Sequence, residues 1–317
     1  MGASRHLGLD LGGTNLKWTV VARDGDAWST VAEGQVPTAL APDPAETPAS
    51  VTRQLAEVGA AAAAAHGPIA SVGIGIPGLY DAATGTTRLL VNVPGPWAGH
   101  PVAAPVGAAL GVPAVLVNDA RAFGLAELRL GAGRGARSMV GMTLGTGIGG
   151  VIAIDGRVHQ GHDGTAGEIG HQTIDPDGPR CGCGNHGCLE AFAKGERLAA
   201  ACGTSSVREA VEKARAGDER ALRGFAEIGR YLGIALANAI VLVTPDRVVI
   251  GGGIAAAGEL LFAPIRAELA RRVTVTSLAE VTLVGAELGT WAGAIGAAVH
   301  GAERAADGGD ATRADGR

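Results

Sequence analysis

The chain has 317 residues, long enough for two domains with buried cores, and carries a formal net charge of −5. An acidic chain without a run of Lys and Arg argues against a nucleic-acid-binding surface. The longest apolar run, residues 234–243, is too short to cross a bilayer and predicts a buried helix, and the N-terminus has no apolar core of a signal peptide. Composition therefore predicts a cytoplasmic protein with neither nucleic acid nor a membrane as partner.

The first part of the chain alternates extended apolar segments with helical ones. Two strands flank a glycine turn near the N-terminus, a Pro-rich loop precedes an Ala-rich helix, and a further helix follows an Asn-Asp pair. The predicted strands are 6–11, 18–22, 71–76 and 114–117, and the predicted helices are 47–66 and 120–130.

About 130 residues later the chain repeats its opening arrangement of strand, glycine turn and strand. The predicted strands of this part are 138–144, 151–155, 247–250 and 281–284, and the chain is predicted helical from the cysteine-rich loop to 243, at 259–272 and at 290–300. Two halves built on one plan predict an α/β protein with two lobes and a central cleft. We expect a smaller lobe at 1–118, with a helix at 290–301 packed on it, a larger lobe at 119–289, and a disordered tail at 302–317.

The cysteine-rich loop contains the ligands of a closed tetrahedral zinc site, namely His171, Cys181, Cys183 and Cys188. Intervening glycines let such a loop wrap around an ion, and the C-x-C spacing suits metal binding in a reducing compartment better than disulfides. The remaining cysteine, Cys202, is expected to be a half-buried thiol. Two glutamates, Glu168 and Glu190, frame the loop, so a structural zinc ion would present their carboxylates to a ligand.

Three glycine-rich turns follow strands and are candidates for phosphate or nucleotide binding. Glycine permits a positive φ and a close approach of the backbone N–H groups to phosphate, although each turn alone could be a plain hairpin or a tight strand–helix connection. None of the three is a Walker A loop, but together they indicate a nucleotide. The candidate residues are Asp10, Gly12, Gly13 and Thr14 in the first turn, Gly145, Thr146 and Gly147 in the second, and Gly251, Gly252 and Gly253 in the third. Asp10 could also hold Mg²⁺ through water.

The pair Asn118-Asp119 lies between a buried strand and a helix, where ligands collect in α/β folds. A carboxylate there can accept the proton of an alcohol during phosphoryl transfer. Asp119 could equally cap the helix, and the two roles can coexist.

Taken together, these motifs resemble the ROK family of bacterial sugar kinases and related repressors. The resemblance covers residues 6–300, and its most specific part is the cysteine motif coupled to the upstream E-x-x-H; the motifs that carry it lie at 10–14, 75–78, 118–119, 144–150, 168–171 and 181–190. It implies the two-lobed actin/hexokinase/Hsp70-type ATPase fold with a zinc-stabilised loop, and a homodimer or homotetramer.

The resemblance also implies roles for individual residues. Asp119 would be the general base, and the phosphates of Mg-ATP would lie on the first two glycine turns, with adenosine near Gly251, Gly252 and Gly253. Sugar hydroxyls would contact Asn118, Glu168, His171 and Glu190, with Gly78 and Asn92 at the rim. His171 would use one ring nitrogen for zinc and the other for the sugar. Residues 91–100 depart from the family pattern, and so does Arg121, which we expect on the solvent face of its helix.

These implications predict ATP-dependent phosphorylation of a hexose, with glucose to glucose 6-phosphate as the leading reaction. Kinases for N-acetylmannosamine, N-acetylglucosamine, mannose or fructose are alternatives within the enzyme class, and polyphosphate is a further possible donor. We do not expect a sugar-sensing repressor, because such family members carry a DNA-binding domain ahead of the kinase-like part and the first phosphate motif here begins at Asp10. A non-catalytic sugar-sensing regulator is disfavoured because Asp10 and Asp119 are both present.

Overall fold

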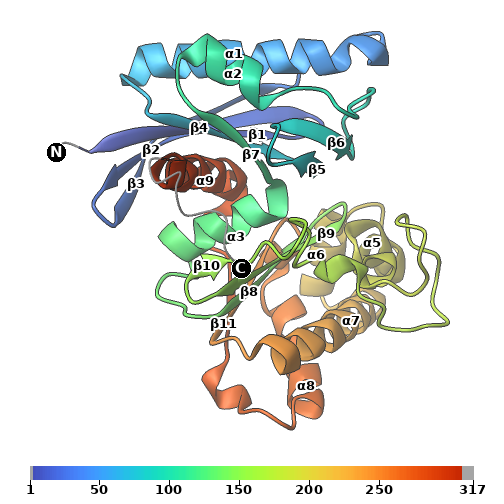
Figure 1. Ribbon diagram of the computed structural model, residues 1–317. Coiled ribbons are helices and arrows are strands. Elements are labelled where there is room, and N and C mark those ends of the chain that lie inside the picture. Colours follow the sequence, from blue (N-terminus) through green and yellow to red (C-terminus); the bar gives the residue numbers. More distant parts are fainter. Residues whose placement is uncertain (1–2, 309–317) are drawn as a thin grey trace. The chain divides into compact units, whose positions relative to one another are not determined.

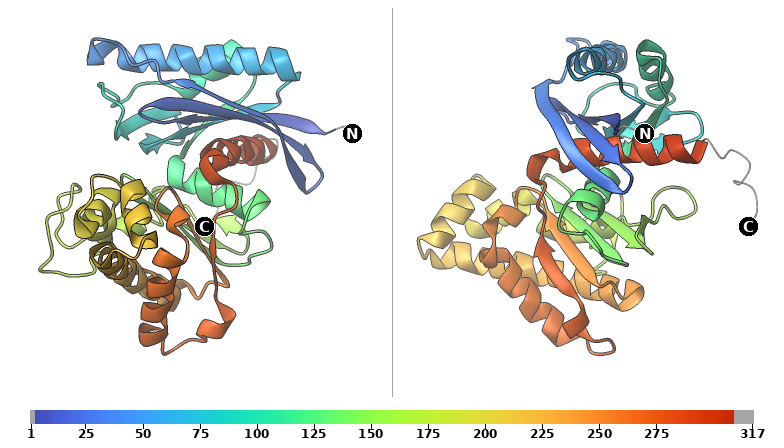
Figure 2. Two further views of the ribbon diagram at one scale, coloured as in Figure 1. Left: turned by 180° about the vertical axis from the view of Figure 1, so that it is seen from behind. Right: turned by 90° about the vertical axis from the view of Figure 1, so that its left-hand side faces the viewer.

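The computed structural model describes residues 3–308, and they divide into two compact units (Figures 1 and 2). The first unit comprises Met1–Leu130 and Thr290–Arg317, and the second comprises Gly131–Gly289. Each unit has its own apolar core and its own five-stranded sheet.

The sheet of the first unit has the order β3-β2-β1-β4-β7, in which β1, β2 and β3 are antiparallel and β4 and β7 run parallel to β1. Helices α1 and α2 lie together on one face of the sheet, while α9 packs against β1 and β4 on the other face beside α3 (Figure 1). The elements are β1 (Ser4–Leu11), β2 (Asn15–Asp24), β3 (Ala27–Pro37), η1 (Pro44–Glu46), α1 (Thr47–His66), β4 (Ser71–Ile76), the hairpin β5 (Gly78–Asp81) and β6 (Thr86–Leu90), α2 (Ala103–Leu110), β7 (Ala114–Asn118), α3 (Asp119–Leu130) and α9 (Ala292–Gly308).

The sheet of the second unit repeats this topology as β10-β9-β8-β11-β12, with β8 in the place of β1. The repeat predicted from the two glycine turns is confirmed. The elements are β8 (Met139–Leu144), β9 (Ile148–Ile154), β10 (Arg157–Val158), η2 (Ile169–His171), α4 (Leu189–Ala193), α5 (Gly195–Cys202), α6 (Val207–Arg215), α7 (Glu219–Val243), β11 (Arg247–Gly251), η3 (Ala255–Ala257), α8 (Glu259–Arg272), η4 (Leu278–Glu280) and β12 (Thr282–Gly285), with η5 (Gly289–Trp291) leading into α9.

Helix α7 is long and apolar enough to pass a length-and-composition test for a membrane span, but half of its most apolar stretch is buried inside the protein. Its inward side chains, such as Phe225, Leu232 and Leu236, belong to the core of the second unit. This burial is typical of the core helix of a globular protein, and it agrees with the buried helix predicted for 234–243.

Four expectations from the sequence differ from the structure. The first unit continues past residue 118 to Leu130, because α3 packs against α9. Helix α9 extends to Gly308, so the tail predicted at 302–317 is wrong for residues 302–308, where Glu303 pairs with Arg129 at 2.8 Å; residues 309–317 lie outside the described residues. Arg121 is not on a solvent face, since it is 1% exposed. Cys202, also 1% exposed, is fully rather than half buried.

Candidate active site

The first glycine turn connects β1 and β2 and is held by the end of β3. Gly12 N–H donates to Asn15 O at 3.0 Å, and Thr38 Oγ1 donates to Gly12 O at 2.7 Å. A Cβ at Gly13 would overlap the carbonyl oxygen of Asn92, so this turn and the predicted sugar-rim residue are in contact. Neither Gly12 nor Gly13 has a positive φ. Close approach, rather than left-handed backbone, is the reason for these glycines.

Asp10 is the second-last residue of β1, close to this turn, and its carboxylate lies beside Gly293 and Gly75. Its carboxylate leaves no room for a Cβ at Gly293 and contacts the position of a Cβ at Gly75 at 3.4 Å. Burial, and then the negative charge of Asp119, raise the pKa of Asp10 to about 6, although Lys17 opposes the shift. A divalent cation would stabilise the ionised form of a partly buried carboxylate that lies near a second one.

Asn118 and Asp119 are brought to the start of α3, as predicted. Asn118 Oδ1 accepts from the N–H groups of Ala120 at 3.1 Å and Arg121 at 3.3 Å, while its Nδ2 donates to Gly78 O at 3.2 Å. Asn118 is therefore the residue that caps α3. Asp119 is exposed, and its Oδ1 accepts from the neighbouring Ala120 N–H at 2.8 Å. Its carboxylate is presented to solvent at a helix N-terminus, where negative charge is stabilised.

Gly78 and Asn92 flank this region on the β5–β6 hairpin and the segment after it. A Cβ at Gly78 would overlap Leu89 O, so the hairpin closes only with glycine there. Asn92 has a φ of 64°, a left-handed conformation that Asn tolerates better than most residues. The structure thus joins Gly78 to Asn118 and Asn92 to Gly13.

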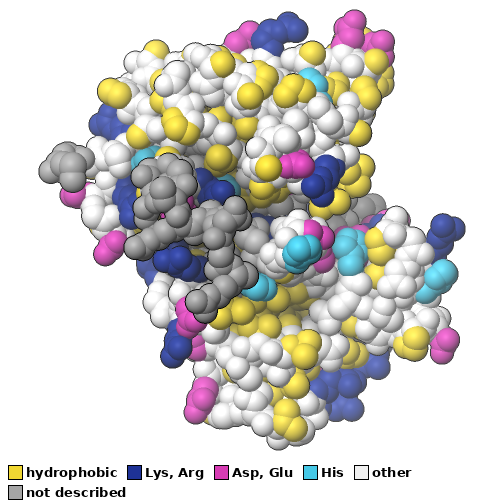
Figure 3. Space-filling model, in the orientation of Figure 1, with side chains coloured by type: hydrophobic (Ala, Val, Ile, Leu, Met, Phe, Trp, Pro, Cys, Tyr) yellow, Lys and Arg dark blue, Asp and Glu magenta, His cyan; other side chains and the backbone are white. Residues whose placement is uncertain are grey.

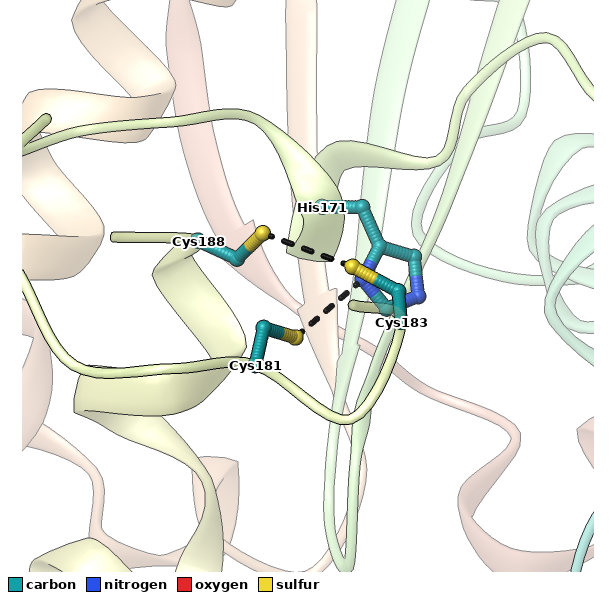
Figure 4. A group of neighbouring side chains, drawn as sticks. All are labelled: His171, Cys181, Cys183 and Cys188. Atoms are coloured by element: carbon teal, nitrogen blue, oxygen red, sulfur yellow. Dashed lines mark hydrogen bonds between the residues drawn. The ribbon is translucent and has the colours of Figure 1, made fainter. Parts of the chain in front are cut away.

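In the second unit the four predicted metal ligands converge (Figure 4). Their ligand atoms all lie within 4.8 Å of one another, with His171 Nδ1 at 3.7 Å from Cys181 Sγ and Cys183 Sγ at 3.7 Å from Cys188 Sγ. Zn–S bonds of about 2.3 Å at tetrahedral angles place two sulfurs about 3.8 Å apart, so these residues fit zinc. Because Nδ1 faces the sulfurs, Nε2 is the nitrogen left for another ligand.

The chemistry of the cysteines agrees with a cation at their centre. Burial, followed by the neighbouring sulfurs of Cys183 and Cys181, raises the pKa of Cys188 to about 11. A thiolate at this position therefore requires a positive charge, which a zinc ion supplies. Among residues 3–308 these four side chains form the one group of three or more His, Cys, Asp or Glu residues whose ligand atoms lie close enough to share a metal ion.

The second glycine turn, between β8 and β9, is bonded to the segment that follows the cysteines. Glu190 Oε2 accepts from Ile148 N–H at 2.9 Å, and Gly195 N–H donates to Gly145 O at 2.9 Å. Glu168 is exposed and begins η2, where His171 N–H donates to its carbonyl oxygen at 3.0 Å.

A cavity of about 900 Å³ opens beside this turn within the second unit. Of the predicted nucleotide residues, Gly145, Thr146 and Gly253 line it, whereas Gly147, Gly251 and Gly252 do not. A Cβ at Gly252 would overlap Leu144 backbone, so Gly252 serves strand packing. Sequence reasoning missed the cavity wall that α5 and α6 supply; its side chains include Lys194, Glu196, Ser205, Ser206, Arg208, Val211 and Arg215.

No motif in the sequence pointed to this wall, because α6 has the pattern of an ordinary surface helix that buries only Ala210 and Ala214. The one local signal was Ser206, a favoured N-cap residue, whose hydroxyl accepts from Glu209 N–H at 3.2 Å. On the face shown in Figure 3, Lys and Arg side chains occur in several separate groups rather than in one patch.

Two sheets of the same order, each with a glycine turn between its first two strands, define an ATPase of the actin/hexokinase type. The family model described as "ROK family" matches residues 6–302, and the chain belongs to this family. It is an ATP-dependent sugar kinase.

Relatives and solved structures cover nearly the whole chain. A glucokinase from Streptomyces coelicolor is 33% identical, covering 92% of this chain and 96% of its own, and an N-acetylgalactosamine kinase from Shewanella is 31% identical, covering 93% and 96%. A ROK hexokinase structure from Thermus thermophilus is 36% identical with a TM-score of 0.80, covering 96% of this chain and 99% of its own. A Streptomyces griseus glucokinase in complex with glucose and AMPPNP is 31% identical with a TM-score of 0.77, covering 95% and 100%.

Proposed function

We propose that this kinase transfers the γ-phosphoryl group of ATP to the 6-hydroxyl of glucose, with Asp119 as the general base. The observation that carries the proposal is the exposed Asp119 carboxylate at the start of α3, next to Asn118, whose Oδ1 accepts from the N–H groups of Ala120 and Arg121. The glucokinase relatives support glucose as the substrate.

In the proposed reaction Asp119 accepts the hydroxyl proton as the sugar oxygen attacks the γ-phosphorus, and ADP leaves. Asp10 would hold Mg²⁺ through water, and the cation would neutralise charge on the phosphates. The backbone N–H groups of the first turn and of Gly145 to Gly147 would bind the phosphates. The cavity beside Gly145 and Gly253 has room for a nucleoside.

For the sugar, we propose hydroxyl contacts from Asn118, Glu168, His171 and Glu190, with Gly78 and Asn92 at the rim. His171 supports this role because its Nδ1 faces the cysteine sulfurs, which leaves Nε2 to bond a hydroxyl. Zinc would be bound by His171, Cys181, Cys183 and Cys188, and its contribution is to fix the shape of the loop.

The substrate is tested with a panel of sugars and ATP in a coupled ADP-release assay. We expect glucose to give the highest kcat/KM, with the product phosphorylated at its 6-hydroxyl. Because the Shewanella relative is an N-acetylgalactosamine kinase, N-acetylated hexosamines belong in the panel with mannose and fructose. Turnover of one of these sugars without turnover of glucose would replace glucose in the proposal.

The base is tested with Asp119→Asn, which keeps the shape of the side chain and removes its basicity. We expect kcat to fall by about 10²-fold or more, since general-base catalysis contributes about 10²–10⁴-fold. Sugar binding, measured by calorimetry, should change little. Asp26→Asn, at an exposed turn, is the matched control and should keep wild-type turnover. Near-wild-type turnover of Asp119→Asn would show that another group takes the proton.

A further inference from the structure

The start of β9, which leaves the turn 145–147, is contacted by η2. A Cβ at Gly170 would overlap the carbonyl oxygen of Ile148, so the backbones of η2 and β9 are in direct contact there. Ile169 is 6% exposed and lies over Gly150, whose Cβ would come 2.8 Å from Ile169 Cγ1. η2 therefore fixes the strand that leaves the turn.

The segment Glu190–Gly195 contacts the same turn from another direction. Glu190 Oε2 accepts from Ile148 N–H at 2.9 Å, and it would lie 2.6 Å from a Cβ at Gly147. Gly195 N–H donates to Gly145 O at 2.9 Å, and Gly145 N–H bonds Gly147 O at 3.0 Å across the turn. Both ends of the turn are thus bonded to this segment.

The metal ligands connect these two contacts. His171 ends η2, and Cys188 is the N-cap of α4, two residues before Glu190. The two segments are also joined by backbone, since Leu189 N–H donates to Gln172 O at 3.0 Å. An ion bound by His171 and Cys188 would hold the elements on both sides of the turn at a fixed separation.

We propose that Glu190 is a positioning residue for the phosphate-binding turn and that the zinc cluster sets its position, so that nucleotide affinity depends on the metal. The inference rests on the proposed assignment of Gly145, Thr146 and Gly147 to ATP. Glu190 occupies the Ile148 N–H, so that N–H fixes the turn and does not bind phosphate. A carboxylate bonded to a backbone N–H is among the stronger hydrogen bonds in proteins.

The experiment measures the Kd of ADP by calorimetry in the zinc-loaded protein without sugar, which separates this role from any contact of Glu190 with the sugar. Glu190→Ala removes the acceptor, and we expect ADP to bind about tenfold more weakly. Glu190→Gln keeps an acceptor oxygen and should bind ADP within about threefold of wild type. Glu227→Ala, at an exposed position of α7, is the matched control. A Kd for Glu190→Ala within twofold of wild type would overturn the proposal.

The metal is tested by repeating the titrations after chelation. Zinc removal should weaken ADP binding about tenfold in wild type but add little to the loss in Glu190→Ala, because both changes release the same turn. Equal losses in the two proteins would mean that zinc does not act through Glu190. If Glu190→Ala does not fold, hydrogen exchange of the Ile148 amide in wild type decides instead. Exchange should accelerate on chelation, and unchanged protection contradicts the proposal.

The sugar-kinase assay separates the two proposals. A protein that turns over no sugar but shows the expected ADP results would lose the proposed function and keep the positioning role. If the wild-type protein phosphorylated glucose but Glu190→Ala bound ADP with the wild-type Kd, the proposed function would stand and the positioning role of Glu190 would be lost.

Discussion

Asp10 and Asp119 are neighbouring carboxylates in different environments, one partly buried near the end of β1 and the other exposed at the start of α3. Burial raises the pKa of Asp10 and so favours its neutral form, whereas a base for phosphoryl transfer must be ionised. The difference in burial supports the two roles proposed above, in which Asp10 holds Mg²⁺ through water and Asp119 accepts the proton of the sugar hydroxyl.

The raised pKa of Asp10 predicts a pH-dependent cost in stability. The folded-state pKa is about 6, against 3.8 for an unperturbed Asp. Between these values the folded state binds more protons than the unfolded state, so stability falls as the pH rises from about 4 to about 6 and the loss is complete above that range. The pKa difference corresponds to about 3 kcal/mol.

Asp10→Asn should therefore raise the melting temperature by several degrees at pH 7.5, in the absence of Mg²⁺ and nucleotide, and by much less at pH 4.5. Asp26→Asn, at an exposed turn, should change the melting temperature little at either pH. A difference between Asp10→Asn and wild type that did not grow with pH would show that Asp10 carries no such cost.

At the scale of elements, the packing of α9 on the first sheet depends on glycines in the two central strands. A Cβ at Gly8 would overlap the carbonyl oxygen of Ala294, and one at Gly73 would overlap that of Ala297. The backbone of α9 therefore lies directly on β1 and β4. No rotamer change can relieve such an overlap, because both partners are backbone.

Gly73→Ala should destabilise the protein by about 3 kcal/mol or more, since the helix must move away from the sheet. The measurement is thermal or urea unfolding followed by circular dichroism. Gly285→Ala, in β12, is the control, because its Cβ would meet only Phe262 Cζ at 3.7 Å. If both variants melted at the wild-type temperature, α9 would not be packed as closely as described.

Elements with a strong periodic signal were predictable from the sequence, among them the buried strands β1, β4 and β11 and the helices α1 and α8. The edge strand β3 was missed because its residues are mostly exposed and lack the apolar pattern of a buried strand. The burial of Arg121 was missed because it follows from the packing of α3, not from the residue type.

The candidate site was predictable to the extent that it consists of short local motifs. The metal ligands were recognisable from their spacing within one loop, and the structure brings them together. Contacts between distant segments were not recognisable, for example Asn118 with Gly78, Asn92 with Gly13, and Glu190 with Ile148. Each of these contacts depends on the topology of its own unit, which brings segments far apart in the sequence together.

At the scale of the whole molecule, the two units share one topology, but the equivalent glycine turns after β1 and β8 are held by different contacts. The turn after β1 is followed by β2 and closed by Thr38 from the end of β3, and it has the partly buried Asp10 before it. The turn after β8 has Thr143 at the position equivalent to Asp10, and Glu190 from the metal-binding loop accepts from Ile148 N–H at its end. The first unit has no comparable group of metal ligands among its described residues.

Because each unit has its own core, perturbing one should leave the other largely protected. Zinc analysis of purified protein should give about one equivalent per chain, and chelation should accelerate hydrogen exchange within 131–289, most strongly at 168–195, since metal binding contributes to folding. Gly73→Ala should instead accelerate exchange in 3–130 and 290–308. Absence of zinc from carefully purified protein would contradict the metal site. Equal loss of hydrogen-exchange protection in both units after each change would show that the two cores do not stabilise their units independently.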